Sequence, residues 1–472
     1  MQGNCRLLLC GFVQGRHGEA DMKKQDITTY GQAVEYIMNI PKFTSKNTME
    51  DTRSFLHRLG DPDAGLRILH VAGTNGKGSV CAYMRSVLEA AGKRVAVFTS
   101  PHLVDVRERF YIDGGMISRE DFFMAFSQVY NKLDWQALEA GEGYHPTFFE
   151  YLFFMAMLLF SRACPDYCIL ETGLGGRLDA TNAVARKEIA VITRIGFDHV
   201  EYLGHTLAAI AGEKAGIMQE GVPVVYADTC SEVGQVIRGK AQFLSADAYP
   251  VSKIDYSFSK NSNKNIDFSY ISRYYGSVSL KIPTFARYQM ENCSLALRAL
   301  EVLTEREKPL QLSAEIIKKG VSASFWPGRM EEVRPDIYVD GAHNVDGVRA
   351  FLESVAADGH KGSRHLLFGV VRDKDYSAML HLIITSGLFE RLSIVQLNNA
   401  RAVSTDGIRQ VLDAYPEITA VQYPSVAAAL QDIMAFSEMC TPSETCTSPE
   451  RIYIAGSLYL AGEVKAILQQ GT

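Results

Sequence analysis

The chain has 472 residues, which is too long for one ordinary hydrophobic core and predicts two domains. Hydrophobic residues make up 47% and charged residues 22%, a globular composition that argues against wholesale disorder. The formal net charge of −6 gives no electrostatic reason to expect nucleic acid or an anionic membrane as a partner. An anionic substrate would therefore need a local positive site and a metal ion.

The nine cysteines are scattered without paired metal-ligand spacing, which suits a reducing cytosol and predicts a cytoplasmic protein. Cys164 and Cys168 could be interpreted as two zinc ligands, but Cys168 lies inside an apolar run, so ordinary thiols are favoured. The most hydrophobic stretch runs from Phe148 to Phe160 and includes Glu150. Because crossing a bilayer takes roughly 20 residues, this shorter stretch predicts a buried helix.

A short apolar run, Leu7 to Val13, lies near the N-terminus. No small-residue cleavage site follows it clearly, so a signal peptide is not favoured. We expect the first 21 residues to be a dispensable tail, with Met22 as the natural beginning of the protein. The N-terminal tail is accordingly placed at residues 1–24.

From Ile68 onward, short β-branched runs alternate with helical segments, a pattern typical of a parallel sheet with crossover helices. The expected strands of the first domain are Ile68–Ala72, Val95–Phe98, Tyr167–Leu170, Ile189–Ile192 and Val222–Val225. Pro223 predicts an edge position for the last of these strands. Residues 252–282 indicate an antiparallel excursion with a polar turn at 259–265, and a helical pattern resumes from Asn292 to Leu303.

The pattern of the first domain ends at Phe325 to Arg329, where Pro327 and Gly328 cannot continue a helix. A second α/β series follows, with expected strands at Ile337–Val339, Leu366–Phe368, Ile394–Leu397 and Ile452–Ala455, and a surface loop at 441–450. We therefore predict an α/β protein with an N-terminal P-loop-type parallel-sheet ATPase domain at 25–325. A smaller C-terminal Rossmann-like α/β domain is expected at 326–472.

A glycine-rich turn between the first strand and its helix is the sharpest chemical signal. It comprises Gly73, Thr74, Asn75, Gly76, Lys77, Gly78 and Ser79. Glycines let the backbone approach phosphates, and the helix N-terminus adds positive potential. Lys77 supplies a mobile charge for the terminal phosphates. The motif departs from the usual P-loop, because only two residues separate its first glycines and Gly78 follows the lysine.

Polar residues also follow successive strands: Ser100, Glu171, and the pair Asp198 and His199. In a parallel sheet the carboxyl ends of the strands share one edge with the phosphate loop. Hydroxyl, carboxylate and imidazole groups beside a nucleotide's phosphates predict a Mg²⁺ site.

Two further segments are unusual. A glycine-rich loop, residues 173–182, directly follows Glu171, and residues 340–344 (DGAHN) follow the first strand of the second domain. Gly456 and Ser457 occupy an equivalent position late in that domain. Active edges on two domains predict a cleft between them.

These segments resemble the folylpolyglutamate and dihydrofolate synthases, relatives of the Mur ligases, over about residues 25–470. The resemblance is carried by GTNGKGS at 73–79, TSPHL at 99–103, TFFE at 147–150, ETGLGGRLDATN at 171–182, DH at 198–199, EKAGI at 213–217, WPGRMEE at 326–332, DGAHN at 340–344, DKD at 373–375 and GSLYL at 456–460.

The resemblance implies roles for residues at matching positions. ATP would be bound by the loop residues 73–79 and by Asn292, Arg329 and Asp340. Magnesium would be bound by Ser100, Glu171, His199 and Lys214. The last of these matches a lysine that family members carry as a carbamate, a metal-binding anion in place of an ammonium. Acceptor-binding positions would be Thr147, Leu178, Asp179 and Ala180. Catalytic roles would fall to Lys77, Lys214, His343 and Asp340, with Ser457 near the incoming glutamate.

The implied reaction is ATP-dependent ligation of L-glutamate to the γ-carboxylate of tetrahydrofolate through an acyl phosphate, in folate biosynthesis and one-carbon metabolism. The implied cofactors are ATP and two Mg²⁺ ions. A dependence on K⁺ is also compatible with the resemblance. The implied partners are folate, L-glutamate and ATP, bound by a monomer. Four alternatives stay open: dihydrofolate synthesis from dihydropteroate, alone or in addition; a Mur-type ligase with another substrate; a simple kinase or ATPase; and an inactive nucleotide-binding regulator.

Overall fold

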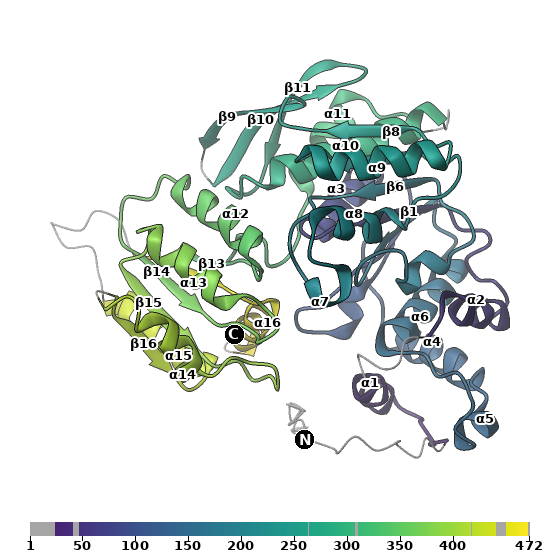
Figure 1. The fold of residues 1–472 in the computed structure, drawn as a ribbon, viewed down its shortest axis with the longest axis horizontal. Coiled ribbons are helices and arrows are strands. Elements are labelled where there is room, and N and C mark those ends of the chain that lie inside the picture. Colours follow the sequence, from purple (N-terminus) through teal and green to yellow (C-terminus); the bar gives the residue numbers. More distant parts are fainter. Residues whose placement is uncertain are drawn as a thin grey trace.

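The computed structural model describes residues 24–40, 47–262, 264–306, 310–416, 418–439 and 450–470. The chain forms two α/β domains, the larger on the right of Figure 1 and the smaller on the left. The expected tail before Met22 and most of the predicted loop at 441–450 lie outside the described residues.

The larger domain is built on a mixed sheet with the strand order β4-β3-β2-β5-β1-β6-β7-β8. Its strands are β1 (Ile68–Ala72), β2 (Val95–Phe98), β3 (Phe110–Ile112), β4 (Gly115–Met116), β5 (Tyr167–Glu171), β6 (Ile189–Ile192), β7 (Val224–Ala227) and β8 (Ala248–Val251). The strand β1 lies between β5 and β6 and is parallel to both. The phosphate loop after β1 therefore has Glu171 on one side and the segment after β6 on the other.

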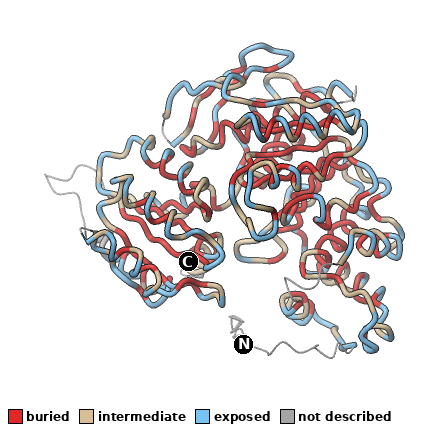
Figure 2. The backbone as a smooth tube through the Cα atoms, viewed as in Figure 1, coloured by how far each residue is buried: buried red, intermediate tan, exposed pale blue. Residues whose placement is uncertain are grey.

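Helices cover both faces of this sheet, and alternate strand residues pack against each layer. One face packs against α3 (Lys77–Ala90), which in turn contacts α10 (Gln289–Arg306) and α11 (Ala314–Ala323). On the other face lie α1 (Tyr30–Asn39), α2 (Met49–Arg58), α4 (Arg119–Asn131), α5 (Trp135–Glu139), α6 (Phe148–Ala163), α7 (Val200–Leu203), α8 (Leu207–Ala215), α9 (Ser231–Phe243), η1 (Val106–Arg109) and η2 (Ala180–Ala183). Figure 2 shows the buried strands at the centre of this domain, covered by helices of which only some residues are exposed.

The antiparallel excursion is confirmed as a separate sheet of β9 (Tyr256–Ser262), β10 (Asn265–Ser272) and β11 (Gly276–Ile282). The long apolar stretch is confirmed as the buried helix α6. Thr147 caps this helix, because its side chain accepts the backbone N–H of Glu150. No helix in the described residues is long and apolar enough to cross a membrane.

The prediction of an edge position for Pro223 is wrong. The neighbouring strand β7 begins at Val224 and is flanked by β6 and β8. Pro223 precedes the strand and uses only its carbonyl, which accepts the Ala190 N–H at 3.0 Å, so its missing N–H breaks no ladder. The edge strand on this side of the sheet, β8, was not predicted, and it contains Pro250.

The smaller domain follows the break at Trp326 and has a sheet with the order β12-β13-β17-β14-β15-β16. Its elements are β12 (Glu331–Arg334), β13 (Ile337–Val339), α12 (Val345–Ala356), β14 (Arg364–Phe368), α13 (Tyr376–Thr385), β15 (Arg391–Val395), α14 (Thr405–Leu412), β16 (Ala420–Tyr423), α15 (Val426–Met439), β17 (Arg451–Ala455) and α16 (Leu458–Gln470). All strands but β12 are parallel, so residues 340–344 and Ser457 share one sheet edge.

Candidate functional site

The phosphate loop opens into a cleft of about 280 Å³ that both domains line. Backbone geometry requires its glycines: a side chain on Gly73 would begin 1.8 Å from Thr193 Oγ1, and Gly76 has a φ of 94°. The helix α3 begins at Lys77, so its first backbone N–H groups have no partner within the helix. The Lys77 ammonium folds back over the loop and donates to the carbonyls of Gly73 and Thr74 at 3.1 and 3.2 Å. Together these groups form a positive cradle for phosphates.

The segment that joins the two domains also contacts the phosphate loop. A side chain on Gly78 would begin 2.7 Å from the indole ring of Trp326, so the segment that joins the domains packs directly against the loop. The helix α10 contributes Asn292, which lies next to Gly76 and whose amide donates to Gln289 Oε1 at 3.1 Å. Gln289 in turn donates to Ser79 Oγ at 3.1 Å. The predicted nucleotide positions on α3 and α10 are thus in one bonded group.

Glu171 ends β5 beside the phosphate loop and is only 3% exposed. Its carboxylate accepts the backbone N–H of Ser100 at 3.2 Å. Burial raises the pKa of Glu171 to about 6, although the positive charges of Lys77 and Arg329 oppose this rise. The group is therefore mostly ionised at neutral pH and would gain from a bound cation.

Lys214, on α8, is equally buried, and its amine donates to the Gly73 carbonyl at 2.9 Å. Burial, together with the neighbouring Lys77 ammonium, lowers the pKa of Lys214 to about 7. A substantial fraction of this amine is therefore neutral at physiological pH and nucleophilic.

His199 begins the turn into α7 with a left-handed backbone, at a φ of 49°. Burial lowers its pKa to about 4, so the ring is neutral and can offer a nitrogen lone pair. The side chain of the preceding residue, Asp198, is 9% exposed, and this partial burial by itself would raise its pKa. His343, Lys374 and His199 outweigh that burial and hold the pKa of Asp198 well below its usual range.

The smaller domain brings a second set of polar groups to the cleft. Asp340 accepts the Tyr288 hydroxyl at 2.5 Å and the backbone N–H groups of Met330 and Ala342 at 3.0 and 2.8 Å. Burial raises the pKa of Asp340, and Arg329 opposes the rise. His343 and Ser457 also line the cleft.

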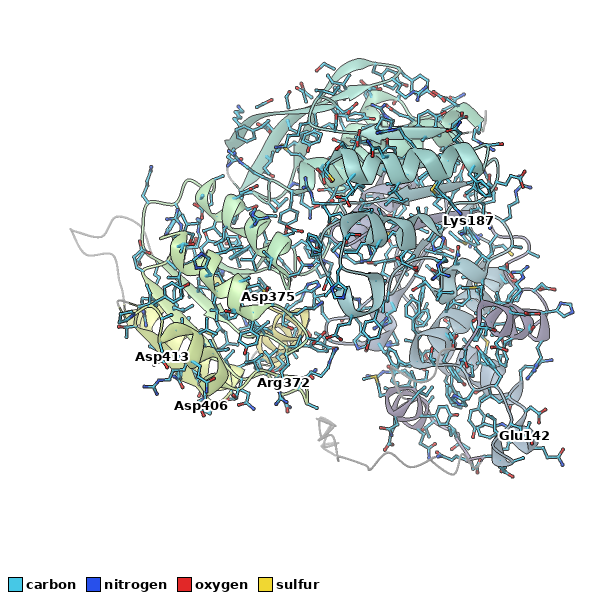
Figure 3. All side chains as sticks on the ribbon, viewed as in Figure 1. Glu142, Lys187, Arg372, Asp375, Asp406 and Asp413 are labelled. Atoms are coloured by element: carbon cyan, nitrogen blue, oxygen red, sulfur yellow. The ribbon has the colours of Figure 1, made fainter. Side chains whose placement is uncertain are left out.

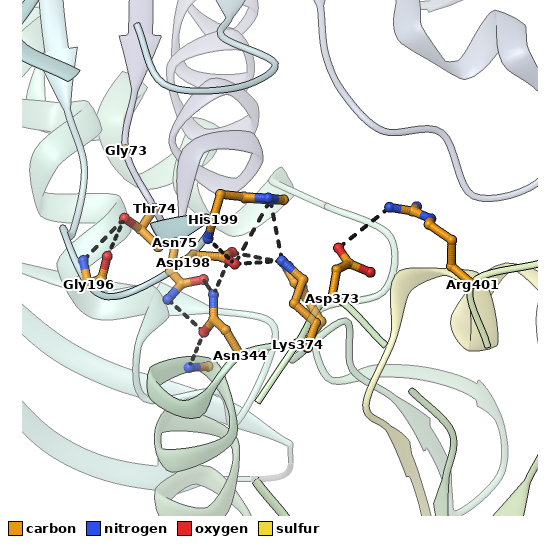
Figure 4. A network of polar contacts seen from close by, with 12 residues as sticks. Gly73, Thr74, Asn75, Gly196, Asp198, His199, Asn344, Asp373, Lys374 and Arg401 are labelled. Atoms are coloured by element: carbon orange, nitrogen blue, oxygen red, sulfur yellow. Dashed lines mark hydrogen bonds and ion pairs between the residues drawn. The ribbon is translucent and has the colours of Figure 1, made fainter. Parts of the chain in front are cut away.

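Polar contacts across the cleft join the two domains (Figure 4). Asn75 and Asn344 exchange amide hydrogen bonds at 3.2 and 3.1 Å. Lys374 donates to Asp198 Oδ1 at 2.5 Å and lies 3.3 Å from His199 Nε2. Asn344 also donates to Asp198 Oδ2 at 3.1 Å. His343 Nε2 lies 3.7 Å from the same oxygen, so three side chains of the smaller domain contact Asp198 of the larger domain.

Family comparisons agree with this geometry. The Mur ligase middle domain matches residues 71–300, and the Mur ligase glutamate ligase domain matches residues 328–441. A relative from Bacillus subtilis (strain 168), named dihydrofolate synthase/folylpolyglutamate synthase, is 36% identical over 364 residues, covering 76% of this chain and 83% of the relative. The chain belongs to the folylpolyglutamate synthase and dihydrofolate synthase family.

Solved structures of the family have the same fold. The apo form of L. casei FPGS has a TM-score of 0.79 at 27% identity and covers 93% of this chain and 100% of its own. E. coli FolC in complex with DHPP and ADP has a TM-score of 0.77 at 26% identity, over 95% of this chain and 100% of its own. These findings confirm the predicted fold, the family resemblance and the ligase class.

The predicted sites of this family member fall into two groups. The cleft is lined by the predicted nucleotide, metal and glutamate positions: residues 73–79, Ser100, Glu171, His199, Lys214, Asn292, Arg329, Asp340, His343 and Ser457. The four predicted acceptor positions do not line it. Thr147 caps α6, Leu178 is 48% exposed, and Ala180 is buried.

Asp179 is 5% exposed and accepts four hydrogen bonds from its own loop. Among the described residues, no three His, Cys, Asp or Glu side chains form a metal-binding group. The predicted magnesium set, which includes a serine and a lysine, stays a prediction.

Sequence reasoning assigned no role to Lys374 or Asn344, although both lie in segments that carry the resemblance, DKD at 373–375 and DGAHN at 340–344. The segments marked these residues, but their partner, Asp198, is 176 and 146 positions away in the chain. Only the arrangement of the two domains in the structure reveals the contacts.

Proposed function

We propose that this chain is a folylpolyglutamate synthase that uses ATP to join L-glutamate to the γ-carboxylate of tetrahydrofolate. The observation that carries the proposal is the cleft itself, where a phosphate-binding loop faces Asp340, His343 and Ser457 of a second domain. The family supplies the substrates: one solved relative is an FPGS–AMPPCP–folate complex, and another holds DHPP and ADP.

The reaction must first activate a carboxylate, which is a poor electrophile at neutral pH. In the proposed route the folate carboxylate attacks the γ-phosphate of ATP, which gives an acyl phosphate and ADP. The amine of glutamate then attacks the acyl carbon, the amide forms and phosphate leaves. Lys77, Arg329 and the first amides of α3 would neutralise the phosphate charge during transfer. Closure of the two domains, which contacts such as that between Asn75 and Asn344 would stabilise, would exclude the water that otherwise hydrolyses the acyl phosphate.

The chemistry of the donor set fits magnesium. Mg²⁺ prefers oxygen ligands, and Glu171 and Ser100 offer a carboxylate and a hydroxyl. His199 would add a neutral nitrogen. When bound, the metal would polarise the phosphoryl oxygens and offset their charge.

As an ammonium, Lys214 does not fit a cation site. A carbamate on the same nitrogen would fit, because it is an anion. A pKa of about 7 favours the neutral amine, which is the form that reacts with CO₂. The proposal therefore includes carbamylated Lys214. It also includes a second magnesium ion, a K⁺ requirement, a monomeric state and a cytoplasmic location.

Dihydrofolate synthesis is the second candidate, because the relative from Bacillus subtilis carries both activities in its name. The test is to offer purified protein ATP, Mg²⁺ and glutamate with either tetrahydrofolate or dihydropteroate, and to identify products by mass spectrometry. A product one glutamate heavier from tetrahydrofolate alone supports the proposal, and products from both acceptors make the enzyme bifunctional. A product from dihydropteroate alone would replace the proposal with dihydrofolate synthesis.

A further inference from the structure

A chain of buried hydrogen bonds connects the strand before the phosphate loop to the glycine-rich loop at 173–182. His70, in the middle of β1, has no solvent exposure, and its Nε2 lies 2.8 Å from Thr181 Oγ1. The Thr181 hydroxyl donates to Asp179 Oδ1 at 2.5 Å. These three side chains form a continuous series between two segments that both reach the cleft.

The direction of each bond follows from the chemistry of the groups. A carboxylate can only accept, so Thr181 gives its single hydroxyl proton to Asp179 and can only accept from His70. The ring therefore carries its proton on Nε2, and Nδ1, which has no hydrogen-bond partner among the described residues, carries the lone pair. Burial, with Lys187 nearby, lowers the pKa of His70 well below its usual value, so the ring is neutral. A neutral His70 ring with its proton on Nε2 can therefore donate to Thr181 Oγ1, as this arrangement of hydrogen bonds requires.

The far end of the series shapes the wall of the cleft. Asp179 Oδ2 accepts the backbone N–H groups of Gly173 and Leu174 at 2.8 and 2.9 Å, and Oδ1 also accepts the Thr181 N–H at 3.0 Å. A carboxylate has about four lone-pair sites, and all four are used here. Gly173 and Leu174 line the cleft directly. The position of this wall therefore depends on how the Asp179 carboxylate is held.

A second anchor fixes the outer end of the same loop. The buried amine of Lys187, labelled in Figure 3, donates to Asn182 Oδ1 at 2.5 Å and to the Ile217 carbonyl at 2.7 Å. The Asn182 amide donates to the carbonyls of Arg177 and Gly216 at 3.2 and 3.1 Å. With its outer end fixed in this way, the inner end at Gly173 and Leu174 is governed by Asp179.

We propose that His70 is a positioning residue for the acceptor, which acts through Thr181 and Asp179 to hold the Gly173–Leu174 wall in place. It does not touch the reacting atoms. The identity of the acceptor, a folate, rests on the proposed function, whereas the effect on the wall does not. A leucine at position 70 would fill the space but leave Thr181 Oγ1 without its donor.

Steady-state kinetics with paired variants test the role. We expect His70→Leu and Thr181→Val each to raise the KM for tetrahydrofolate about tenfold, the effect of one neutral hydrogen bond, with the KM for ATP unchanged. His70→Gln keeps an N–H donor and should restore most of the loss. The double variant should be no worse than Thr181→Val, because the two residues act in one series.

His365 is a matched control for the loss of a buried histidine. It lies on β14 of the smaller domain with no measurable exposure, and its Nε2 is 2.7 Å from Ser393 Oγ. His365→Leu should lower thermal stability about as much as His70→Leu and leave both KM values unchanged.

Amide hydrogen exchange gives a readout that does not depend on turnover. In His70→Leu, exchange at Gly173 and Leu174 should become about tenfold faster, while the amides of Thr74 and Asn75, bonded to the Arg194 carbonyl, should not change. Equal rises in the two KM values, no rescue by glutamine, or unchanged exchange at Gly173 and Leu174 would overturn the role. If the unaltered protein shows no glutamate-dependent turnover, the proposed function fails, and exchange alone decides the positioning.

Discussion

Lys214 provides a prediction in which stability and activity move in opposite directions. Burial and the Lys77 ammonium lower its pKa to about 7, against 10.5 for an ordinary lysine. At about 1.4 kcal/mol per pKa unit, keeping this amine protonated inside the protein costs up to roughly 5 kcal/mol. The cost is fully present below a pH of about 7 and disappears as the pH rises to about 10.5, because across that window only the unfolded chain binds the proton.

Lys214→Met replaces the amine with an apolar side chain of similar length, and the Gly73 carbonyl keeps its bond from Lys77. Apolar replacement of buried charged groups commonly stabilises proteins by about 1–4 kcal/mol, so we expect a gain of about 2 kcal/mol at about pH 6. This corresponds to a rise of several degrees in the Tm of the larger domain. The gain should vanish at about pH 10, whereas turnover should fall at least about a hundredfold at every pH.

Differential scanning calorimetry at the two pH values, in CO₂-free buffer, measures the stability change, and ADP release measures turnover. Lys253→Met, at an exposed position, is the matched control and should change neither. Lower stability of Lys214→Met than of the unaltered protein at about pH 6, or an equal gain at both pH values, would refute the reasoning.

Three further changes test the cleft. At a Mg²⁺ concentration well below saturation, turnover should fall as the pH drops through about 6, where Glu171 in the metal-free protein gains its proton, and Glu171→Gln should lose at least about a hundredfold; a pH profile of ADP release under these conditions that stays flat to about pH 5 would contradict this. Gly76→Ala places Cβ 2.2 Å from Asn292 Oδ1 on a backbone with a φ of 94°, so the Kd for ADP, measured by calorimetry, should rise at least about tenfold. Lys374→Met breaks the contact with Asp198 between the domains, so kcat/KM should fall about tenfold or more. Small-angle X-ray scattering should report a larger radius of gyration for this variant. An unchanged radius of gyration would argue against this contact as one that holds the two domains together.

Much of the fold could be predicted because its central strands are buried on both faces and appear in the sequence as short β-branched runs. Ile68–Ala72 and Ile189–Ile192 were predicted with their observed bounds. The strands at and near the two edges of the larger sheet were harder to predict. Strand β8 is partly exposed and contains Pro250, and the hairpin of β3 and β4 is only a few residues long, so neither has a clear apolar pattern.

The candidate site could be predicted only as far as the backbone determines it. Strand order places Ser100, Glu171 and His199 at one edge, and this required only the parallel pattern. The hydrogen bonds of a side chain depend on partners far away in the sequence. Asp198 is bound by the smaller domain, and Asp179 is saturated by its own loop, whereas the resemblance implied a direct acceptor contact for Asp179.

The most direct test of the central claim is ADP release by the purified protein with ATP, Mg²⁺ and tetrahydrofolate, measured with and without L-glutamate. The account predicts ADP release that requires both tetrahydrofolate and glutamate, with one product heavier by one glutamate for each ADP. ADP release that is indifferent to glutamate, or no release with the complete mixture, would contradict the assignment as a ligase.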